Sequence, residues 1–159
     1  MTTATTGQEL TARNHFGFGV GTFGRDAAYT MVSLYLIFYL TDVLHVSSTV
    51  LLSTTAIIVV VRVLDAISDP FIGVLVDNTQ TKWGKFKPWI LGGGFASAFL
   101  MVLLFTDFQL SNWQFLTVFF FVYTLYSIAY TANDVAYWST LPALSQSQRQ
   151  REKIGSFAR

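Results

Sequence analysis

Three ionisable side chains lie close together in an otherwise apolar stretch of this sequence: Arg62, Asp65 and Asp69. In a helix, residues three, four and seven positions apart share one face, so these side chains would point the same way. One arginine neutralises one carboxylate, which leaves the cluster with a spare negative charge. At membrane depth each such charge costs about 2.5–3.5 kcal/mol even on the lowest scales. The stretch therefore predicts a site for a cation, either a metal ion or a proton.

The same cluster also has two structural interpretations. Arg62 could form an internal ion pair that locks two helices together, which accounts for one aspartate and leaves the other unexplained. Alternatively, Asp69 and Pro70 could cap a new helical turn, because aspartate suits an N-cap and proline suits the first helical position. The capping interpretation is compatible with a cation site.

A second group of polar and aromatic side chains lies further along the chain. Its members recur at helical spacing and therefore share one face: Tyr130, Thr131, Asp134, Tyr137 and Trp138. A carboxylate accepts hydrogen bonds from sugar hydroxyls, and an indole ring covers the apolar C–H side of a sugar. In the alternative, Trp138 anchors the helix at the membrane interface and Asp134 pairs with an arginine. Thr131 could instead lend its hydroxyl to the cation site.

The composition indicates an integral membrane protein. Of the 159 residues, 52% are hydrophobic and only 12% are charged, about half the roughly 25% typical of soluble proteins. The absence of cysteine excludes disulfides, thiolate metal sites and thiol nucleophiles. His15 and His45 have no partners at metal-ligand spacing, so sodium at Asp65 and Asp69 is the one metal considered. We expect no cofactor and no nucleic-acid partner.

Apolar stretches of about 20 residues or more predict helices that cross a lipid bilayer. We expect a disordered tail at 1–15 and the start of a fifth span from 154. Between them, the predicted spans are 16–41, 49–76, 88–106 and 113–141, with Pro142 ending the fourth.

The charges in the loops and spans predict the orientation and a polar interior. Lysine and arginine concentrate in the tail, in the 77–87 loop and in the 143–153 loop, and are absent from the turns at 42–48 and 107–112. The positive-inside rule then places the N-terminus in the cytoplasm. We expect the protein to lie in the cell membrane. Three of the spans carry at least one acid each, so we expect them to face a common water-filled interior.

Two groups of glycines predict close helix packing. The spacing of a dinucleotide-binding loop is matched by Gly19, Gly21 and Gly24. We reject dinucleotide binding because no predicted strand precedes these glycines and a predicted membrane span follows them. Small residues instead let another helix approach closely. The tract Gly92–Gly94 favours tight packing or bending for the same reason.

Four separated stretches, in the right order, resemble the glycoside–pentoside–hexuronide:cation symporters, the group of melibiose permease within the major facilitator superfamily. They are Phe23–Asp26, Arg62–Gly73, Trp83–Trp89 and Tyr130–Ser139, and the resemblance extends from about Phe16 to Arg159. It implies an all-α integral membrane protein. The chain would supply the N-terminal part, about four transmembrane helices and the start of a fifth, of a twelve-helix carrier with alternating access.

The resemblance also implies roles for individual residues. Those implied for the coupling cation are Asp65, Asp69, Ser68 and Thr131, with Arg62 as an internal ion-pair partner. Those implied for the sugar are Asp26 and Asp134 as acceptors, Trp138 as the stacking ring, Tyr130, and Arg25 and Arg159 as donors. Members like melibiose permease carry asparagine where this chain has Ser68, whose oxygen has a shorter reach. The coupling ion is therefore open between sodium and a proton.

These observations predict a carrier that is not an enzyme. It would couple sodium or proton entry to uptake of a glycoside, oligosaccharide or pentoside, and its partners would be the sugar, the lipid bilayer and the missing C-terminal half. Being short, the chain is expected to be an N-terminal fragment. A four-span oligomeric ion channel or a membrane regulatory subunit is the alternative. An intramembrane hydrolase using Asp65 and Asp69 as acid and base would lack a nucleophile.

Overall fold

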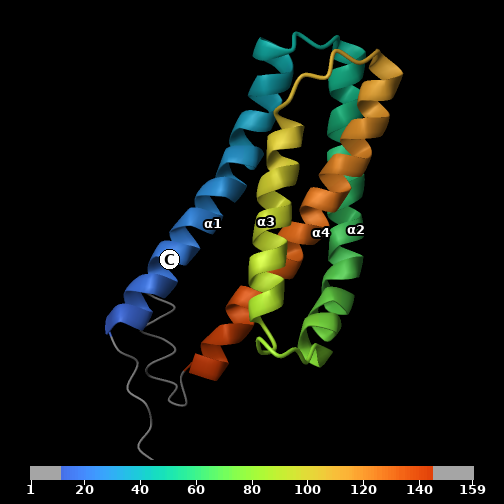
Figure 1. Ribbon diagram of the computed structural model, residues 1–159. Coiled ribbons are helices and arrows are strands. Elements are labelled where there is room, and N and C mark those ends of the chain that lie inside the picture. Colours follow the sequence, from blue (N-terminus) through green and yellow to red (C-terminus); the bar gives the residue numbers. More distant parts are fainter. Residues whose placement is uncertain (1–11, 145–159) are drawn as a thin grey trace, which may run out of the picture.

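The computed structural model describes residues 12–144, with side chains from 19 to 140, and all of its regular elements are helices. They are α1 (Ala12–Phe38), the short π-helical turn η1 (Tyr39–Val43), α2 (Ser48–Asn78), α3 (Lys87–Leu104) and α4 (Asn112–Leu144). The four long helices run alternately up and down, and α1 leans away from the others toward its N-terminus (Figure 1). The predicted all-α architecture is confirmed.

Three of these helices are long and apolar enough to cross a membrane: α2, α3 and the 112–140 part of α4. At 1.5 Å per residue, the 31 residues of α2 extend about 46 Å, beyond the roughly 30 Å of a bilayer core. Within the described residues α1 is not in this set, although it has 27 residues. Its crossing of the membrane stays a prediction.

Several helix boundaries differ from those predicted. Helix α2 continues without interruption through Asp69 and Pro70, so the capping interpretation is wrong. Proline removes one helical hydrogen bond, here to the carbonyl of Ala66, and the surrounding bonds and packing carry the helix across it. Likewise α4 extends past Pro142 to Leu144.

The chain ends also depart from the predicted boundaries. Residues 12–15 of the predicted disordered tail belong to α1. The remainder of that tail and the predicted fifth span lie outside the described residues.

Helices α3 and α4 cross closely because glycine and asparagine meet there. A Cβ atom added at Gly93 would lie 2.8 Å from the backbone oxygen of Ala129, a distance that real Cβ atoms do not adopt. The buried Asn133 Nδ2 donates to the Ile90 carbonyl oxygen at 2.6 Å. The predicted close packing of the Gly92–Gly94 tract is therefore confirmed at Gly93 and Gly94, where an added Cβ would meet α4, and not at Gly92.

The earlier glycines behave unequally. A Cβ at Gly21 would lie 3.0 Å from the Tyr137 hydroxyl, whereas at Gly24 nothing lies within 4 Å. Thr22 Oγ1 and the Tyr137 hydroxyl lie 2.9 Å apart and hydrogen-bond. Close approach of α1 to α4 is therefore confirmed at Gly21 and not at Gly24.

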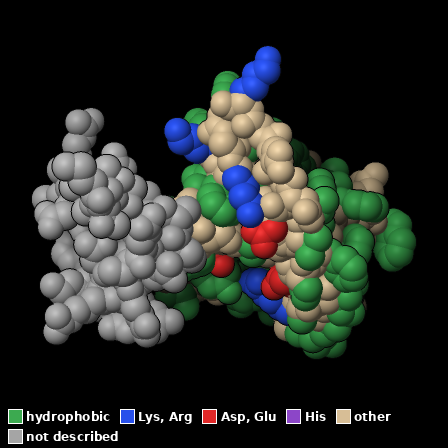
Figure 2. Space-filling model, turned by 90° about the horizontal axis from the view of Figure 1, so that it is seen from below, with side chains coloured by type: hydrophobic (Ala, Val, Ile, Leu, Met, Phe, Trp, Pro, Cys, Tyr) green, Lys and Arg blue, Asp and Glu red, His purple; other side chains and the backbone are tan. Residues whose placement is uncertain are grey.

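The connection between α2 and α3 lies at the same end of the bundle as the start of α1 and the end of α4 (Figure 1). Figure 2 shows this end, where basic side chains stand beside acidic ones. Lys85 Nζ lies 3.0 Å from Asp77 Oδ1. Because the helices alternate in direction, the N-terminal end of α1, the α2–α3 loop and the end of α4 lie on one side (Figure 1), as the positive-inside rule requires. Which side faces the cytoplasm stays a prediction.

Candidate functional site

An open cavity of about 420 Å³ lies between three helices and contains most of the predicted site. Its lining residues are Tyr29 from α1, Arg62, Asp65, Ala66 and Asp69 from α2, and Tyr130, Thr131 and Asp134 from α4. Three residues predicted for a cation therefore meet two predicted for a sugar, namely Asp65, Asp69 and Thr131 with Tyr130 and Asp134. Of the three acid-bearing spans predicted to share an interior, α2 and α4 contribute acids to this cavity, whereas Asp26 of α1 does not line it.

Arg62 pairs with one of the two aspartates on its own helix. Its Nη1 lies 3.4 Å from Asp65 Oδ2, and its Nη2 donates to the Tyr123 hydroxyl at 3.1 Å. The guanidinium carbon also lies 5.7 Å from the centre of the Tyr29 ring, within the range of cation–π attraction. The internal ion pair predicted for Arg62 is present in the structure.

Asp69 differs from Asp65 in having no ion pair or hydrogen bond to any side chain among the described residues. Asp65 also accepts a hydrogen bond from Ser127 Oγ, at 2.5 Å. The spare negative charge inferred from the sequence therefore resides on Asp69, at the edge of an open cavity.

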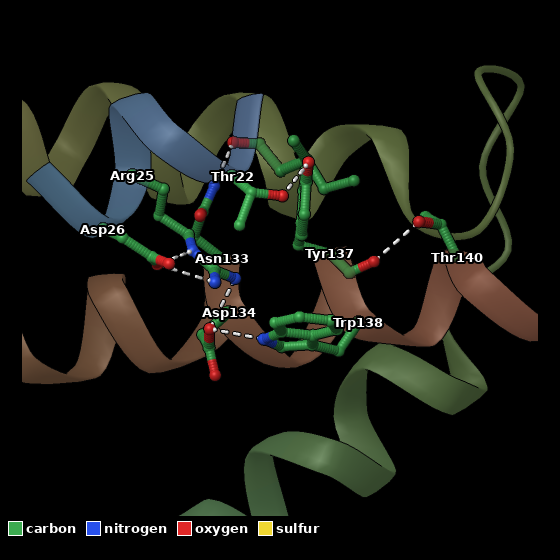
Figure 3. Close-up of polar contacts among 9 residues, drawn as sticks. Thr22, Arg25, Asp26, Asn133, Asp134, Tyr137, Trp138 and Thr140 are labelled. Atoms are coloured by element: carbon green, nitrogen blue, oxygen red, sulfur yellow. Dashed lines mark hydrogen bonds and ion pairs between the residues drawn. The ribbon is translucent and has the colours of Figure 1, made fainter. Parts of the chain in front are cut away.

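Arg25 lies between two carboxylates and two aromatic rings. Its Nη1 lies 2.5 Å from Asp134 Oδ1 and its Nη2 lies 2.9 Å from Asp26 Oδ1. Its guanidinium carbon lies 4.9 Å from the centre of the Tyr137 ring and 5.2 Å from that of Trp138. The side chain is only 10% exposed, and Figure 3 shows it between α1 and α4. The pairing of Asp134 with an arginine, weighed as an alternative, is therefore present.

Asp134 has one oxygen engaged and one available. Trp138 Nε1 donates to Oδ1 at 3.1 Å, and the same oxygen faces Arg25 (Figure 3). Oδ2 has no partner among the described residues, and the side chain is 37% exposed. Asp134 can therefore accept a hydroxyl from a ligand while its orientation is fixed by Arg25 and Trp138.

Some residues predicted for the site lie outside the cavity lining. The Ser68 hydroxyl donates to the backbone oxygen of Asp65 at 3.3 Å, within its own helix. Arg25, Asp26 and Trp138 are connected to the cavity through Asp134 rather than lining it. Arg159 lies outside the described residues.

Three residues of this region escaped the sequence analysis: Tyr29, Tyr123 and Ser127. The ring of Tyr29 stacks on that of Tyr130, with centroids 5.0 Å apart. Ser127 precedes Thr131 by four positions, and Tyr123 precedes Ser127 by four. Extending the predicted polar face of α4 by two helical turns toward its N-terminus would have found both.

Comparison with known proteins gives a consistent family. The profile of the MFS/sugar transport protein family matches residues 17–159. The lactose permease of Lactobacillus delbrueckii subsp. bulgaricus is 36% identical over 152 residues, which cover 92% of this chain and 24% of the permease. The raffinose carrier protein of Pediococcus pentosaceus is 37% identical over 152 residues, covering 89% of this chain and 24% of the carrier.

A third relative is more distant. The glucuronide carrier protein homolog of Escherichia coli (strain K12) is 30% identical over 152 residues, covering 94% of this chain and 32% of that protein. The chain spans about a quarter of the length of the first two curated relatives. Because the family match extends over nearly the whole sequence, this chain belongs to the MFS/sugar transport protein family, as its resemblance to glycoside–pentoside–hexuronide symporters predicted.

Proposed function

We propose that this chain forms the N-terminal part of a secondary transporter that couples a cation to the uptake of a sugar. The observation that supports this function is the open cavity in which Asp65, Asp69 and Thr131 meet Tyr130 and Asp134. Carboxylate and hydroxyl oxygens suit a sodium ion, and either carboxylate could instead take a proton. Two relatives of this chain are named for the sugars lactose and raffinose.

The cation would bind between the two aspartates of α2. Asp69 supplies a charge without an ion-pair partner in the described part of the chain, and Asp65 supplies one oxygen that Arg62 does not face. A bare charge resists transfer through a closed, dehydrated state, and a bound cation removes that resistance. Thr131 would add a hydroxyl oxygen from α4.

The sugar would bind toward α1 and the C-terminal part of α4. Asp134 Oδ2 and Asp26 accept hydroxyl hydrogen bonds, and Arg25 donates. The Trp138 and Tyr130 rings cover the C–H face of the sugar. We propose glycosides as the substrate class and a sodium ion or a proton as the co-transported cation. The proposed transport involves no catalytic step.

The proposed setting is the cell membrane, with the start of α1 on the cytoplasmic side. The remaining part of the carrier would complete the cavity from the opposite side and provide alternating access. The sugar, the lipid bilayer and that remaining part are the partners that this function requires.

The test uses the full-length carrier that contains this chain, reconstituted in sealed vesicles. Uptake of labelled lactose, raffinose, a glucuronide and a xyloside is followed under an imposed sodium gradient and then under a proton gradient. One gradient is expected to stimulate at least one sugar, and Asp69→Asn is expected to abolish that stimulation. Asp107→Asn is the matched control, because this exposed aspartate lies in a loop, does not line the cavity and accepts a backbone hydrogen bond from Gln109.

Two results would contradict the proposal. Gradient-driven uptake that survives in Asp69→Asn would remove the cation role of that residue. Ion conductance that is independent of every sugar would favour the channel alternative instead.

A further inference from the structure

Two parallel contacts join α2 to α4 beside the cavity. Ser127 Oγ donates to Asp65 Oδ2 at 2.5 Å, and one helical turn away Arg62 Nη2 donates to the Tyr123 hydroxyl at 3.1 Å. Ser127 is 4% exposed and Tyr123 is 2% exposed. The Ser127–Asp65 contact is the better shielded from water, because the Asp65 side chain is 13% exposed and that of Arg62 is 43% exposed. A hydrogen bond to a charged group has a larger effect where water is excluded.

The two oxygens of Asp65 have different surroundings because of these contacts. Oδ2 accepts from Ser127 and faces Arg62 Nη1 at 3.4 Å. Oδ1 has no hydrogen-bond partner among the described residues. With Oδ2 held by α4, the carboxylate cannot rotate freely, and Oδ1 is the oxygen that remains for a ligand.

We propose that Ser127 is a positioning residue for the cation site, and this inference rests on the function proposed above. Its hydroxyl orients the Asp65 carboxylate so that Oδ1 is presented to a cation shared with Asp69. Ser127 itself does not line the cavity. It acts on cation affinity through Asp65 and makes no contact with the sugar.

This role differs from that of a residue that only holds two helices together. Loss of a purely structural contact lowers thermal stability and impairs the whole cavity, sugar binding included. Loss of a positioning contact leaves the helices packed and lets the carboxylate rotate away. It therefore weakens cation binding selectively, because the cation needs both carboxylates at fixed positions.

The test compares three variants of the full-length carrier in vesicles. Ser127→Ala removes the hydroxyl and Ser127→Thr retains it. Thr124→Val is the matched control, since Thr124 lies on the same helix and its hydroxyl donates only to the Phe120 backbone oxygen, at 2.7 Å. Three quantities are measured for each: the cation concentration that gives half-maximal uptake, the KM for sugar at saturating cation, and the melting temperature in detergent.

In Ser127→Ala we expect the half-maximal cation concentration to rise about tenfold, the cost of one hydrogen bond to a charged group. The sugar KM should stay close to wild type while the melting temperature falls slightly, because one interhelical hydrogen bond is lost. All three quantities should stay close to wild type in Ser127→Thr and Thr124→Val. An unchanged cation dependence in Ser127→Ala overturns the inference. So does a parallel loss of cation affinity, sugar affinity and melting temperature, or a threonine variant that behaves like alanine. If wild-type uptake has no cation dependence, the proposed function itself fails.

Discussion

At the scale of single residues, the arginines of the candidate site neutralise only some of its carboxylates. Arg25 faces both Asp26 and Asp134, and Arg62 faces Asp65 alone. Each arginine fixes one oxygen of a cavity carboxylate, and the second oxygen of that carboxylate has no partner among the described residues. Since guanidinium groups do not lose their proton, the charge available for binding must come from the acids.

Trp138 offers a test at this scale, because its ring and its N–H group have separate roles. Trp138→Phe keeps an aromatic face and removes the hydrogen bond to Asp134 Oδ1. We expect the KM for sugar to rise about tenfold, since a hydrogen bond to a carboxylate contributes about 1.5–3 kcal/mol. Uptake kinetics at saturating cation would measure it. Trp113→Phe, at an exposed ring remote from the cavity, is the control, and equal effects in the two variants would contradict the assignment.

Much of the site could be predicted from sequence because its residues follow helical spacing. Asp65 and Asp69 share one face of α2, Thr131 and Asp134 share one face of α4, and all four line the cavity. The Ser127–Asp65 hydrogen bond could not be predicted this way. It joins positions 62 residues apart, and the relative rotation of α2 and α4 that creates it depends on packing along both helices.

At the scale of helices, the most extensive contact in the described part of the bundle is between α3 and α4. Without a hydrophobic driving force in lipid, helices associate through van der Waals packing and interhelical hydrogen bonds. Gly93 allows close van der Waals packing, and Asn133 donates an interhelical hydrogen bond. The sequence predicted the glycine contact, but the position of Asn133 against the Ile90 carbonyl required knowledge of the crossing.

Adjacent glycines on α3 provide a matched pair of substitutions. Gly93→Ala places a methyl group where the backbone oxygen of Ala129 lies 2.8 Å away, so we expect a loss of about 1–3 kcal/mol from overpacking. Gly92→Ala meets nothing within 4 Å and should be neutral or stabilising by about 0.5–1 kcal/mol. The melting temperature in detergent should therefore fall in Gly93→Ala and stay unchanged or rise in Gly92→Ala. Equal shifts of the melting temperature in the two variants would show that α3 and α4 can move apart at their crossing without further cost.

Helix continuity was less predictable than helix content. The sequence placed a proline beside Asp69 and could not decide whether the helix stops or continues there. In the structure α2 continues through Pro70, because one missing hydrogen bond is outweighed by the bonds and contacts on either side. Local propensity alone does not contain those contacts.

At the scale of the whole molecule, the proposed cation and sugar sites lie in one cavity, so the two ligands should influence each other's binding. If the cation raises the affinity for sugar by some factor, the sugar must raise the affinity for the cation by the same factor. We expect coupling of about 5–150-fold, the usual range for linked sites. Calorimetric titration of the full-length carrier with each ligand, in the presence and absence of the other, would measure both factors. Independent binding would contradict a shared site.

The absence of cysteine in these 159 residues makes the orientation directly testable. Lys82→Cys, in the loop between α2 and α3, should react with a membrane-impermeant maleimide only after the cells are permeabilised. Phe108→Cys, in the loop at the opposite end, should react in intact cells. Any cysteines in the remainder of the carrier would first be replaced. Reversed labelling would show the N-terminus to be outside.

The contacts of Arg25 also bear on how the protein is made. If α1 crosses the membrane as predicted, it would enter before α4 has been synthesised. Within the described residues α1 is less apolar than the three helices that are long and apolar enough to cross. Its own Asp26 offers the first counter-ion to Arg25, and Asp134 replaces water on the other side only later. Stable integration of α1 should therefore be completed after translation of α4, which makes biogenesis of this bundle depend on the same carboxylate that we propose for the sugar.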